Sequence, residues 1–213
     1  FKAQLLLETS DVEAGSGKEI KYTARRGVAV STKCTPRYVY ADAKNGAKLA
    51  VLGTYRNITA TGALPLALTN CLNFASPENP EIMGQIVASI EGISDAAKNL
   101  DFPIVSGNAS LSNQTNERCI KPTPAIGGVG VIKDTLKACN YKLKNEEEFI
   151  FVIGATKGHL ENTLYANVVE KHFGGLVPEV NFKEELLNSK FIREAILNGF
   201  VSACAAVLDA GII

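Results

Sequence analysis

The sequence has 213 residues, which is enough for one large domain or two small ones with a hydrophobic core. Apolar residues make up 46% and charged residues 21%, a composition typical of globular rather than disordered proteins. Lys plus Arg and Asp plus Glu are both 22, so the formal net charge is zero. No overall field therefore favours nucleic acid or an anionic membrane surface, and any phosphate must be bound locally.

The cysteines and the hydropathy pattern indicate in which cellular compartment the protein is expected. The five cysteines include no C-x-x-C pair and no histidine at metal-ligand spacing. An odd count without a signal peptide indicates reduced thiols and a cytoplasmic location. The apolar runs are far shorter than the ~20 residues of a membrane helix, so we expect no membrane association. The chain begins at Phe1 and ends on an apolar run, which suggests a fragment or a protease-trimmed product.

The first third of the chain predicts two strands and a helix after a poorly patterned start. Residues 2–8 are compatible with a strand, and the glycines of residues 15–18 indicate a loop. Alternating apolar residues predict a half-buried strand over residues 28–32. Residues 46–60 predict a helix that Gly62 ends, and residues 64–69 predict a second strand.

The clearest helix is expected over residues 80–100. Pro80 suits its first turn, and Ile82, Ile86, Ile90, Ile93, Ala97 and Leu100 form one apolar stripe. Residues 103–106 predict a short buried strand. Residues 125–132 predict another, and its three glycines indicate a bulge or a close approach of backbone.

The last third begins with a charged stretch, residues 142–148, which we interpret as a surface connection between two domains. A new strand is expected over residues 149–153, followed by helices over 161–172 and 184–199. The expected division is a domain of residues 1–146 and the beginning of a second domain, residues 147–213. Strands and helices alternate irregularly, which favours an α+β fold.

The most informative segment, residues 105–116, runs from an apolar strand into a glycine and short polar side chains. Gly107 would let a ligand approach the backbone, and Asn108 offers a carbonyl oxygen that Mg²⁺ accepts alongside phosphate oxygens. Ser110 can hydrogen-bond a phosphate or an amide. The alternative interpretation is a structural turn rich in Asn and Ser, and composition alone favours it.

Two further segments end in polar residues. Residues 66–74 contain Asn70 at the end of a strand, and the simpler interpretation is a strand-to-loop transition. Arg37 follows the first strand and has the geometry to bind a phosphate or carboxylate, although solvated loop arginines are commoner. No P-loop is present. His159 and His172 have no partners that suggest a catalytic triad, and we interpret both as structural.

Taken together, these segments resemble the second half of phosphoribosylformylglycinamidine synthase. The resemblance covers residues 27–211 approximately and includes Cys71-Leu72-Asn73-Phe74. Its other motifs are residues 32–40, 56–58 with 61–63, 77–81, and 106–108 with 122–124. Aminoimidazole ribonucleotide synthetase, a related ATP-using enzyme, matches these strings less well.

The resemblance implies a synthetase-like repeat unit. In it, an α/β domain forms half of an eight-stranded barrel and is followed by part of a second α/β domain. The implied enzyme is an ATP-dependent ligase of purine biosynthesis. It converts formylglycinamide ribonucleotide, ATP and ammonia from a glutaminase subunit or domain to the amidine. The barrel implies a further partner, either the missing first half or a second copy of the chain.

The resemblance also implies site residues. Gly107 and Asn70 fall on ATP-contact positions, Asn108 on a Mg²⁺-ligand position, and Ser110 on a substrate-contact position. The chain departs from the family pattern at several positions: Asn70 replaces an aspartate, Lys33 and Thr35 replace Asp and Asn, and Ala75 replaces a glycine. In residues 202–211, only Asp209 and Gly211 remain of the motif residues that the family has there. These losses motivate a second hypothesis, in which the chain is a non-catalytic binding or scaffolding module.

Overall fold

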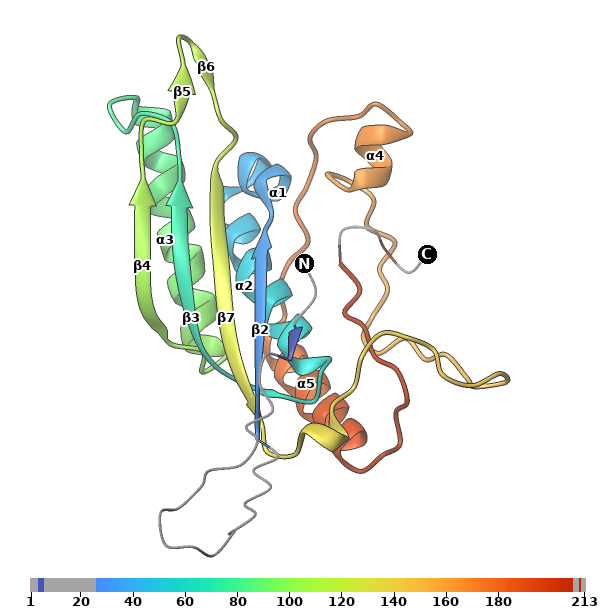
Figure 1. Cartoon of the computed structure of the whole chain (residues 1–213). Coiled ribbons are helices and arrows are strands. Elements are labelled where there is room, and N and C mark those ends of the chain that lie inside the picture. Colours follow the sequence, from blue (N-terminus) through green and yellow to red (C-terminus); the bar gives the residue numbers. More distant parts are fainter. Residues whose placement is uncertain (1–3, 6–25, 209–210, 212–213) are drawn as a thin grey trace, which may run out of the picture.

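A five-stranded mixed sheet forms the centre of the computed structural model, which describes residues 4–5, 26–208 and 211 (Figure 1). The strand order is β1-β2-β7-β3-β4. The strands are β1 (Gln4–Leu5), β2 (Gly27–Cys34), β3 (Leu64–Asn73), β4 (Ile104–Ser110) and β7 (Thr123–Ile132). β3 pairs with β4 in parallel, and the other pairs are antiparallel. The expected α+β class is confirmed. The glycine loop expected over residues 15–18 lies outside the described residues.

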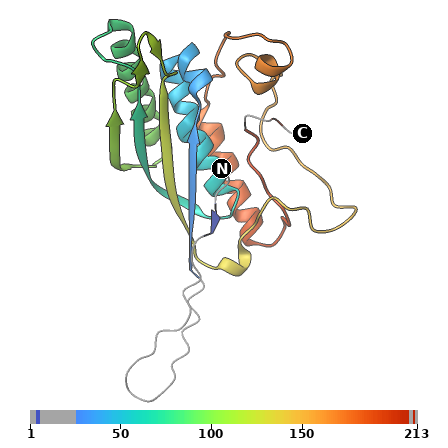
Figure 2. The same cartoon turned by 45° about the horizontal axis from the view of Figure 1, so that its top comes forward.

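Three helices cover one face of this sheet: α1 (Pro36–Ala41), α2 (Ala43–Thr59) and α3 (Pro80–Asn99), as Figures 1 and 2 show. α2 begins three residues earlier than expected because Asp42 caps it, its side chain accepting from the Asn45 backbone N–H at 3.0 Å. Asn79 caps α3 in the same way, accepting from the Glu81 N–H at 2.9 Å. α1 was not expected from the sequence, although Pro36 stands in its first turn.

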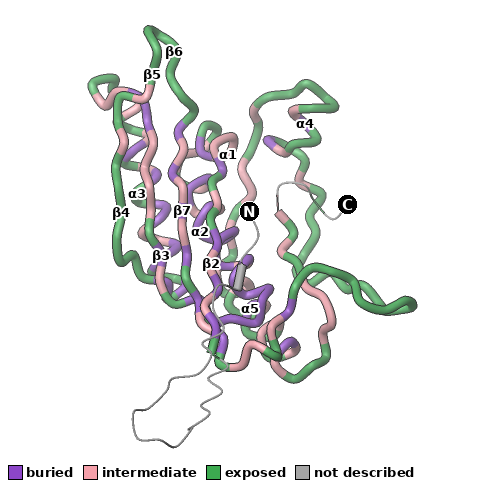
Figure 3. Tube along the Cα trace, in the orientation of Figure 1, coloured by how far each residue is buried: buried purple, intermediate pink, exposed green. Residues whose placement is uncertain are grey.

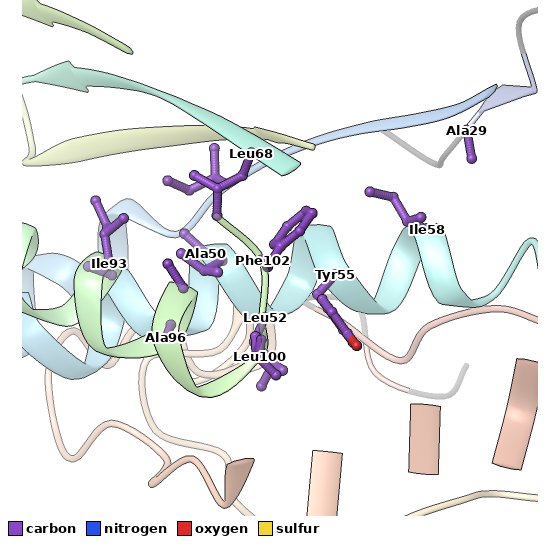
Figure 4. Close-up of a cluster of buried hydrophobic side chains, with 14 of the residues drawn as sticks. Ala29, Ala50, Leu52, Tyr55, Ile58, Leu68, Ile93, Ala96, Leu100 and Phe102 are labelled. Atoms are coloured by element: carbon purple, nitrogen blue, oxygen red, sulfur yellow. The ribbon is translucent and has the colours of Figure 1, made fainter. Parts of the chain in front are cut away.

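The hydrophobic core lies between α2, α3 and the sheet (Figure 4). Ile58 of α2 and Ile93 of α3 are almost completely buried, as is Leu68 of β3. Phe102, on the connection from α3 to β4, packs edge-on against Tyr55 with ring centroids 5.5 Å apart. The apolar stripe expected on α3 is mostly confirmed: Ile86, Ile93, Ala97 and Leu100 are buried, whereas Ile90 is 45% exposed.

The glycines of β7 let α2 approach the sheet closely. A β-carbon placed on Gly128 would lie 2.5 Å from Thr54 Cγ2 and 2.9 Å from Ile58 Cδ1. One on Gly130 would lie 2.3 Å from Ile58 Cγ2. The close backbone approach expected from these glycines is therefore confirmed, since any side chain here would push the helix away.

No helix of the described chain covers the opposite face of the sheet (Figures 1 and 3). Strand pairing places Val30, Val129 and Leu64 toward this face, and Val129 is 41% and Leu64 49% exposed. β4 forms the edge of the sheet. Four long strands with one helix-covered and one uncovered face are the arrangement expected of half a barrel.

β4 differs from the short buried strand expected over residues 103–106. It extends to Ser110, and nearly all its residues are exposed because it is an edge strand. A small hairpin of β5 (Gln114–Thr115) and β6 (Arg118–Cys119) then leads back to β7, which matches the strand expected over 125–132.

The chain after β7 contains a 3₁₀ turn, η1 (Thr135–Lys137), and two helices, α4 (Leu164–Val168) and α5 (Phe182–Leu197). α5 confirms the last expected helix and packs against α2, where Arg56 forms an ion pair with Glu185. The strand expected over residues 149–153 is wrong: these residues form no strand and are exposed. The helix expected over 161–172 is reduced to α4, because Asn162 adopts a positive φ of 58° before it.

The division at residues 146 and 147 stays a prediction, although α5 packs on the first part of the chain. No helix in the described part of the chain combines the length and apolar character that crossing a membrane requires.

Candidate functional site

A hollow of about 440 Å³ lies on the sheet among the four long strands. β3 and β4 are parallel, so their carboxyl ends lie at the same edge of the sheet. The residues that line the hollow are Thr32 of β2, Thr69, Asn70 and Cys71 of β3, Ser106, Gly107 and Asn108 of β4, and Ala125, Ile126 and Gly127 of β7. The polar strand ends noted in the sequence therefore come together in space.

Three of the four expected site residues border this hollow. Asn70, Gly107 and Asn108 belong to its lining, and Asn70 and Gly107 are paired across β3 and β4. Ser110 does not belong to the lining. Its hydroxyl lies 3.2 Å from Asn113 Oδ1, in the turn that leads from β4 into the β5–β6 hairpin. Ser110 therefore has a local structural partner outside the hollow.

Strand alternation divides the expected residues between the two faces of the sheet. Asn70 is paired with Ile126, which is fully buried under the helices, so Asn70 and its partner Gly107 face the helix layer. Asn108 and Ser110 face the uncovered side. A β-carbon on Gly107 would lie 2.7 Å from Asn70 Oδ1. The missing side chain of Gly107 thus makes room for the amide of Asn70, and both contribute their backbone to the hollow.

The uncovered side of β3 and β4 carries a row of hydrogen-bonded polar side chains. The hydroxyls of Thr69 and Ser106 are 2.7 Å apart. Next to them, Asn108 Nδ2 donates to Cys71 Sγ at 3.5 Å. Thr69, Cys71 and Ser106 were not identified from the sequence. The available signal was their spacing of two residues along strands that end in polar residues, which places them beside Asn108.

Among the described residues that line the hollow, none has an ionised side chain, and the thiol of Cys71 is the one titratable group. The shifted pKa values lie elsewhere: a hydrogen bond from Lys48 lowers the pKa of Asp95, and burial raises that of Cys139. Within the described residues, no group of three or more His, Cys, Asp or Glu side chains could hold a metal ion. The oxygens of Asn108, Thr69 and Ser106 suit Mg²⁺ only as neutral ligands beside a more charged donor such as a triphosphate.

The remaining candidates have structural contacts. Arg37 Nε donates to the backbone oxygen of Asn162 at 3.0 Å, so this guanidinium joins α1 to the segment before α4. The ring of His159 lies 6.4 Å from that of Tyr38. Both contacts fasten the later segment onto α1, which agrees with the structural interpretation of this histidine. Asp209, a retained family residue, lies outside the described residues.

Curated relatives match this chain over most of its length. It is 46% identical over 190 residues to phosphoribosylformylglycinamidine synthase subunit PurL of Acidiphilium cryptum, covering 89% of this chain and 26% of that protein. The PurL subunit of Novosphingobium aromaticivorans is 41% identical over 218 residues, covering all of this chain and 30% of that protein. The chain thus spans less than a third of the length of these relatives. The resemblance identified in the sequence is confirmed.

Solved structures of Thermotoga maritima PurL share the fold. The complex with ATP is 26% identical with a TM-score of 0.55, covering 67% of this chain and 22% of that one. The complex with AMPPCP is 27% identical with a TM-score of 0.54 and the same coverage. The complex with FGAR covers 93% of this chain and 26% of that one with a TM-score of 0.62, and at 20% identity it supports the fold alone.

The family model described as "AIR synthase related protein, N-terminal domain" matches residues 17–132. This range contains β2 to β7, and with them the four long strands of the sheet and every residue that lines the hollow. The chain therefore belongs to the family of AIR synthase related proteins.

Proposed function

We propose that this chain is a nucleotide-binding segment of a phosphoribosylformylglycinamidine synthase. The observation that carries the proposal is the hollow on the sheet along β3 and β4, where Asn70, Gly107 and Asn108 meet in a chain 46% identical to a PurL subunit. Solved PurL structures of the same fold carry ATP, AMPPCP or ADP. The proposed reaction is the ATP-dependent conversion of formylglycinamide ribonucleotide to its amidine, in the cytoplasm, with ammonia from a glutaminase partner.

Each residue of the hollow has a role that its position supports. The backbone at Gly107 is exposed at the sheet edge, so a nucleotide can approach it without a side chain in between. The amide oxygen of Asn108 is a neutral ligand suited to a nucleotide-bound Mg²⁺, which would neutralise charge on the transferred phosphoryl group. Asn70 would act through its backbone, while its side-chain amide fills the space beside Gly107. Ser110, outside the hollow, would contact the more distant substrate.

The uncovered sheet face supports the proposed need for a second half. Val30, Leu64 and Val129 lie on this face, and the outer edge of β4 has no pairing strand among the described residues. Exposed apolar surface and an unpaired strand edge both favour association. The occupant would be the other half of the barrel or a second copy of this chain. Sedimentation should therefore show association, and a strictly monomeric, stable chain would contradict this part of the proposal.

The second candidate, a non-catalytic binding module, is favoured by one observation: none of the described residues that line the hollow has an ionised side chain. Growth of a purine auxotroph distinguishes the two candidates. Rescue by this chain, supplied with the remaining parts of a related synthase, would exclude the non-catalytic role.

Calorimetric titration with ATP, with and without Mg²⁺, tests the proposed site directly. The Asn108→Ala variant should lose the metal-dependent part of the affinity. The matched control is Asn99→Ala, an exposed asparagine at the end of α3, which should bind like the unchanged chain. Equal metal dependence in Asn108→Ala and the unchanged chain would contradict the role given to Asn108.

A further inference from the structure

The amide of Asn108 can present either its oxygen or its NH₂ group to the hollow, and only the oxygen can bind a cation. The two orientations are nearly identical in shape, so the hydrogen-bond network around the side chain decides between them. Asn108 lies on β4 directly opposite Cys71 of β3. The network that decides its orientation begins two residues further along β3, at Asn73.

The amide of Asn73 is fixed by two backbone carbonyls. Its Nδ2 donates to Cys71 O at 3.0 Å and to Thr123 O, on β7, at 3.1 Å. A carbonyl oxygen can only accept, so the NH₂ group of Asn73 must lie on this side. Oδ1 of Asn73 is thereby left as an acceptor on the opposite side of the amide.

The thiol of Cys71 transmits this orientation to β4. Cys71 Sγ lies 3.7 Å from Asn73 Oδ1, and because that oxygen cannot donate, the S–H group must be the donor. The sulfur then has only lone pairs left for Asn108, which lies 3.5 Å away through Nδ2. Asn108 must therefore direct its NH₂ group to the sulfur and keep Oδ1 for another partner.

We propose that Cys71 is a positioning residue that orients the amide of Asn108 with its oxygen available to a nucleotide-bound cation. Every donor in this series points the same way: Asn108 donates to the thiol, the thiol donates to Asn73, and Asn73 donates to the carbonyls of Cys71 and Thr123. Groups on three strands, β7, β3 and β4, thus determine the orientation of the Asn108 amide. The cation part of this inference rests on the proposed function, whereas the orientation of the amide does not.

The binding test compares Cys71→Ala, Cys71→Ser and the control Cys119→Ala, an exposed cysteine on the β5–β6 hairpin, in the full chain. Cys71→Ala should weaken the binding of Mg²⁺-ATP about fivefold, the effect of one neutral hydrogen bond, and leave metal-free ATP binding unchanged. Cys71→Ser keeps a donor and an acceptor and should stay within about twofold of the unchanged chain. Equal affinities for Mg²⁺-ATP in Cys71→Ala and Cys119→Ala, or equal losses in the Ala and Ser variants, would overturn the proposal.

A second measurement needs neither nucleotide nor metal. In ¹⁵N–¹H spectra, Cys71→Ala should shift the side-chain NH₂ resonances of Asn108, because their acceptor is gone. Those of Asn73 should shift less, since its NH₂ group keeps both backbone acceptors and only its oxygen loses the thiol. Unchanged Asn108 resonances would overturn the orienting role of Cys71. Shifted resonances in a chain that binds no ATP would uphold that role and count against the proposed function alone.

Discussion

Replacing Gly128 with alanine tests how tightly α2 is packed on the sheet that carries the hollow. The new β-carbon would lie 2.5 Å from Thr54 Cγ2, 2.8 Å from Phe102 Cζ and 2.9 Å from Ile58 Cδ1. Carbon atoms pack at about 3.5–4.0 Å, so the helix or these side chains must move by roughly 1 Å. Overpacking of this kind costs about 1–3 kcal/mol, partly offset by about 0.5–1 kcal/mol from the lower entropy of the unfolded alanine chain. We expect a net loss of about 1–2 kcal/mol.

Gly127→Ala is the matched control, because the next residue of the same strand faces the uncovered side. Its β-carbon would lie 2.9 Å from Thr69 Cγ2, a single close contact among the described residues, and Thr69 is exposed and can move aside, so we expect a smaller loss, below about 1 kcal/mol. Thr54→Ser removes the closest contact of Gly128→Ala but keeps the hydroxyl that bonds Ala50 O and Ile126 O. The double variant should therefore lose less stability than the two single changes added together.

Urea denaturation followed by circular dichroism measures these differences. A loss of 1–2 kcal/mol corresponds to a fall of about 2–8 °C in Tm for a chain of this size. If Gly128→Ala is no less stable than Gly127→Ala, the close packing of α2 against β7 does not contribute as described. An additive double variant would exclude Thr54 as the obstructing side chain.

Three further predictions concern the chain after β7. Glu185→Gln weakens the half-buried ion pair with Arg56, so it should lower the free energy of unfolding by about 1 kcal/mol and speed amide hydrogen exchange in α5. Unchanged exchange in α5 would show that other contacts hold the helix. Asn162→Ala should make residues 160–176 more susceptible to proteolysis, since it strains a positive φ and removes two bonds to backbone carbonyls, and an unchanged cleavage pattern would refute this. Burial raises the pKa of Cys204 to about 11, so only about one thiol in a thousand is ionised at pH 8. Cys204 should accordingly react with iodoacetamide far more slowly than the exposed Cys119 at pH 8 and gain reactivity as the pH rises toward 11; equal rates at pH 8 would contradict this.

Helices and strands were predicted well where the signal lies in neighbouring residues, such as a helix cap, an apolar stripe or a run of glycines. The helix over residues 80–100 has a proline in its first turn, a capping asparagine and an apolar stripe, and it ends one residue earlier than expected. The glycines of residues 127–130 correctly indicated a close approach because no side chain fits between β7 and α2. α1 was missed because a helix of six residues is too short to show a periodic pattern.

The errors come from elements whose state depends on distant partners. Residues 149–153 have the composition of a strand, but no strand among the residues that the structure describes pairs with them. β4 has an apolar beginning, and its exposure follows from its place at the sheet edge, which local sequence does not specify.

The functional roles of the candidate site residues stay a prediction, and the sequence did not specify how these residues are arranged. Asn70, Gly107 and Asn108 do meet, yet the pairing of β3 with β7 decides that Asn70 faces the helices. The role of Cys71 follows from the parallel register of β3 and β4, which brings residues 37 positions apart into contact. Such a register is set by packing across the whole sheet.

The exposed segment of residues 149–153 has a consequence for handling this protein. Five consecutive apolar residues with high strand propensity and no charge are a sequence that promotes intermolecular β-assembly. Three glutamates, Glu146, Glu147 and Glu148, stand directly before it and act as charged gatekeepers. Hydrogen bonds from Asn145 and Ser202 lower the pKa of Glu148, so this carboxylate keeps its charge to a lower pH than an ordinary glutamate. Acidification far enough to protonate Glu148 should therefore promote precipitation, and this point is reached at a lower pH than for an ordinary glutamate.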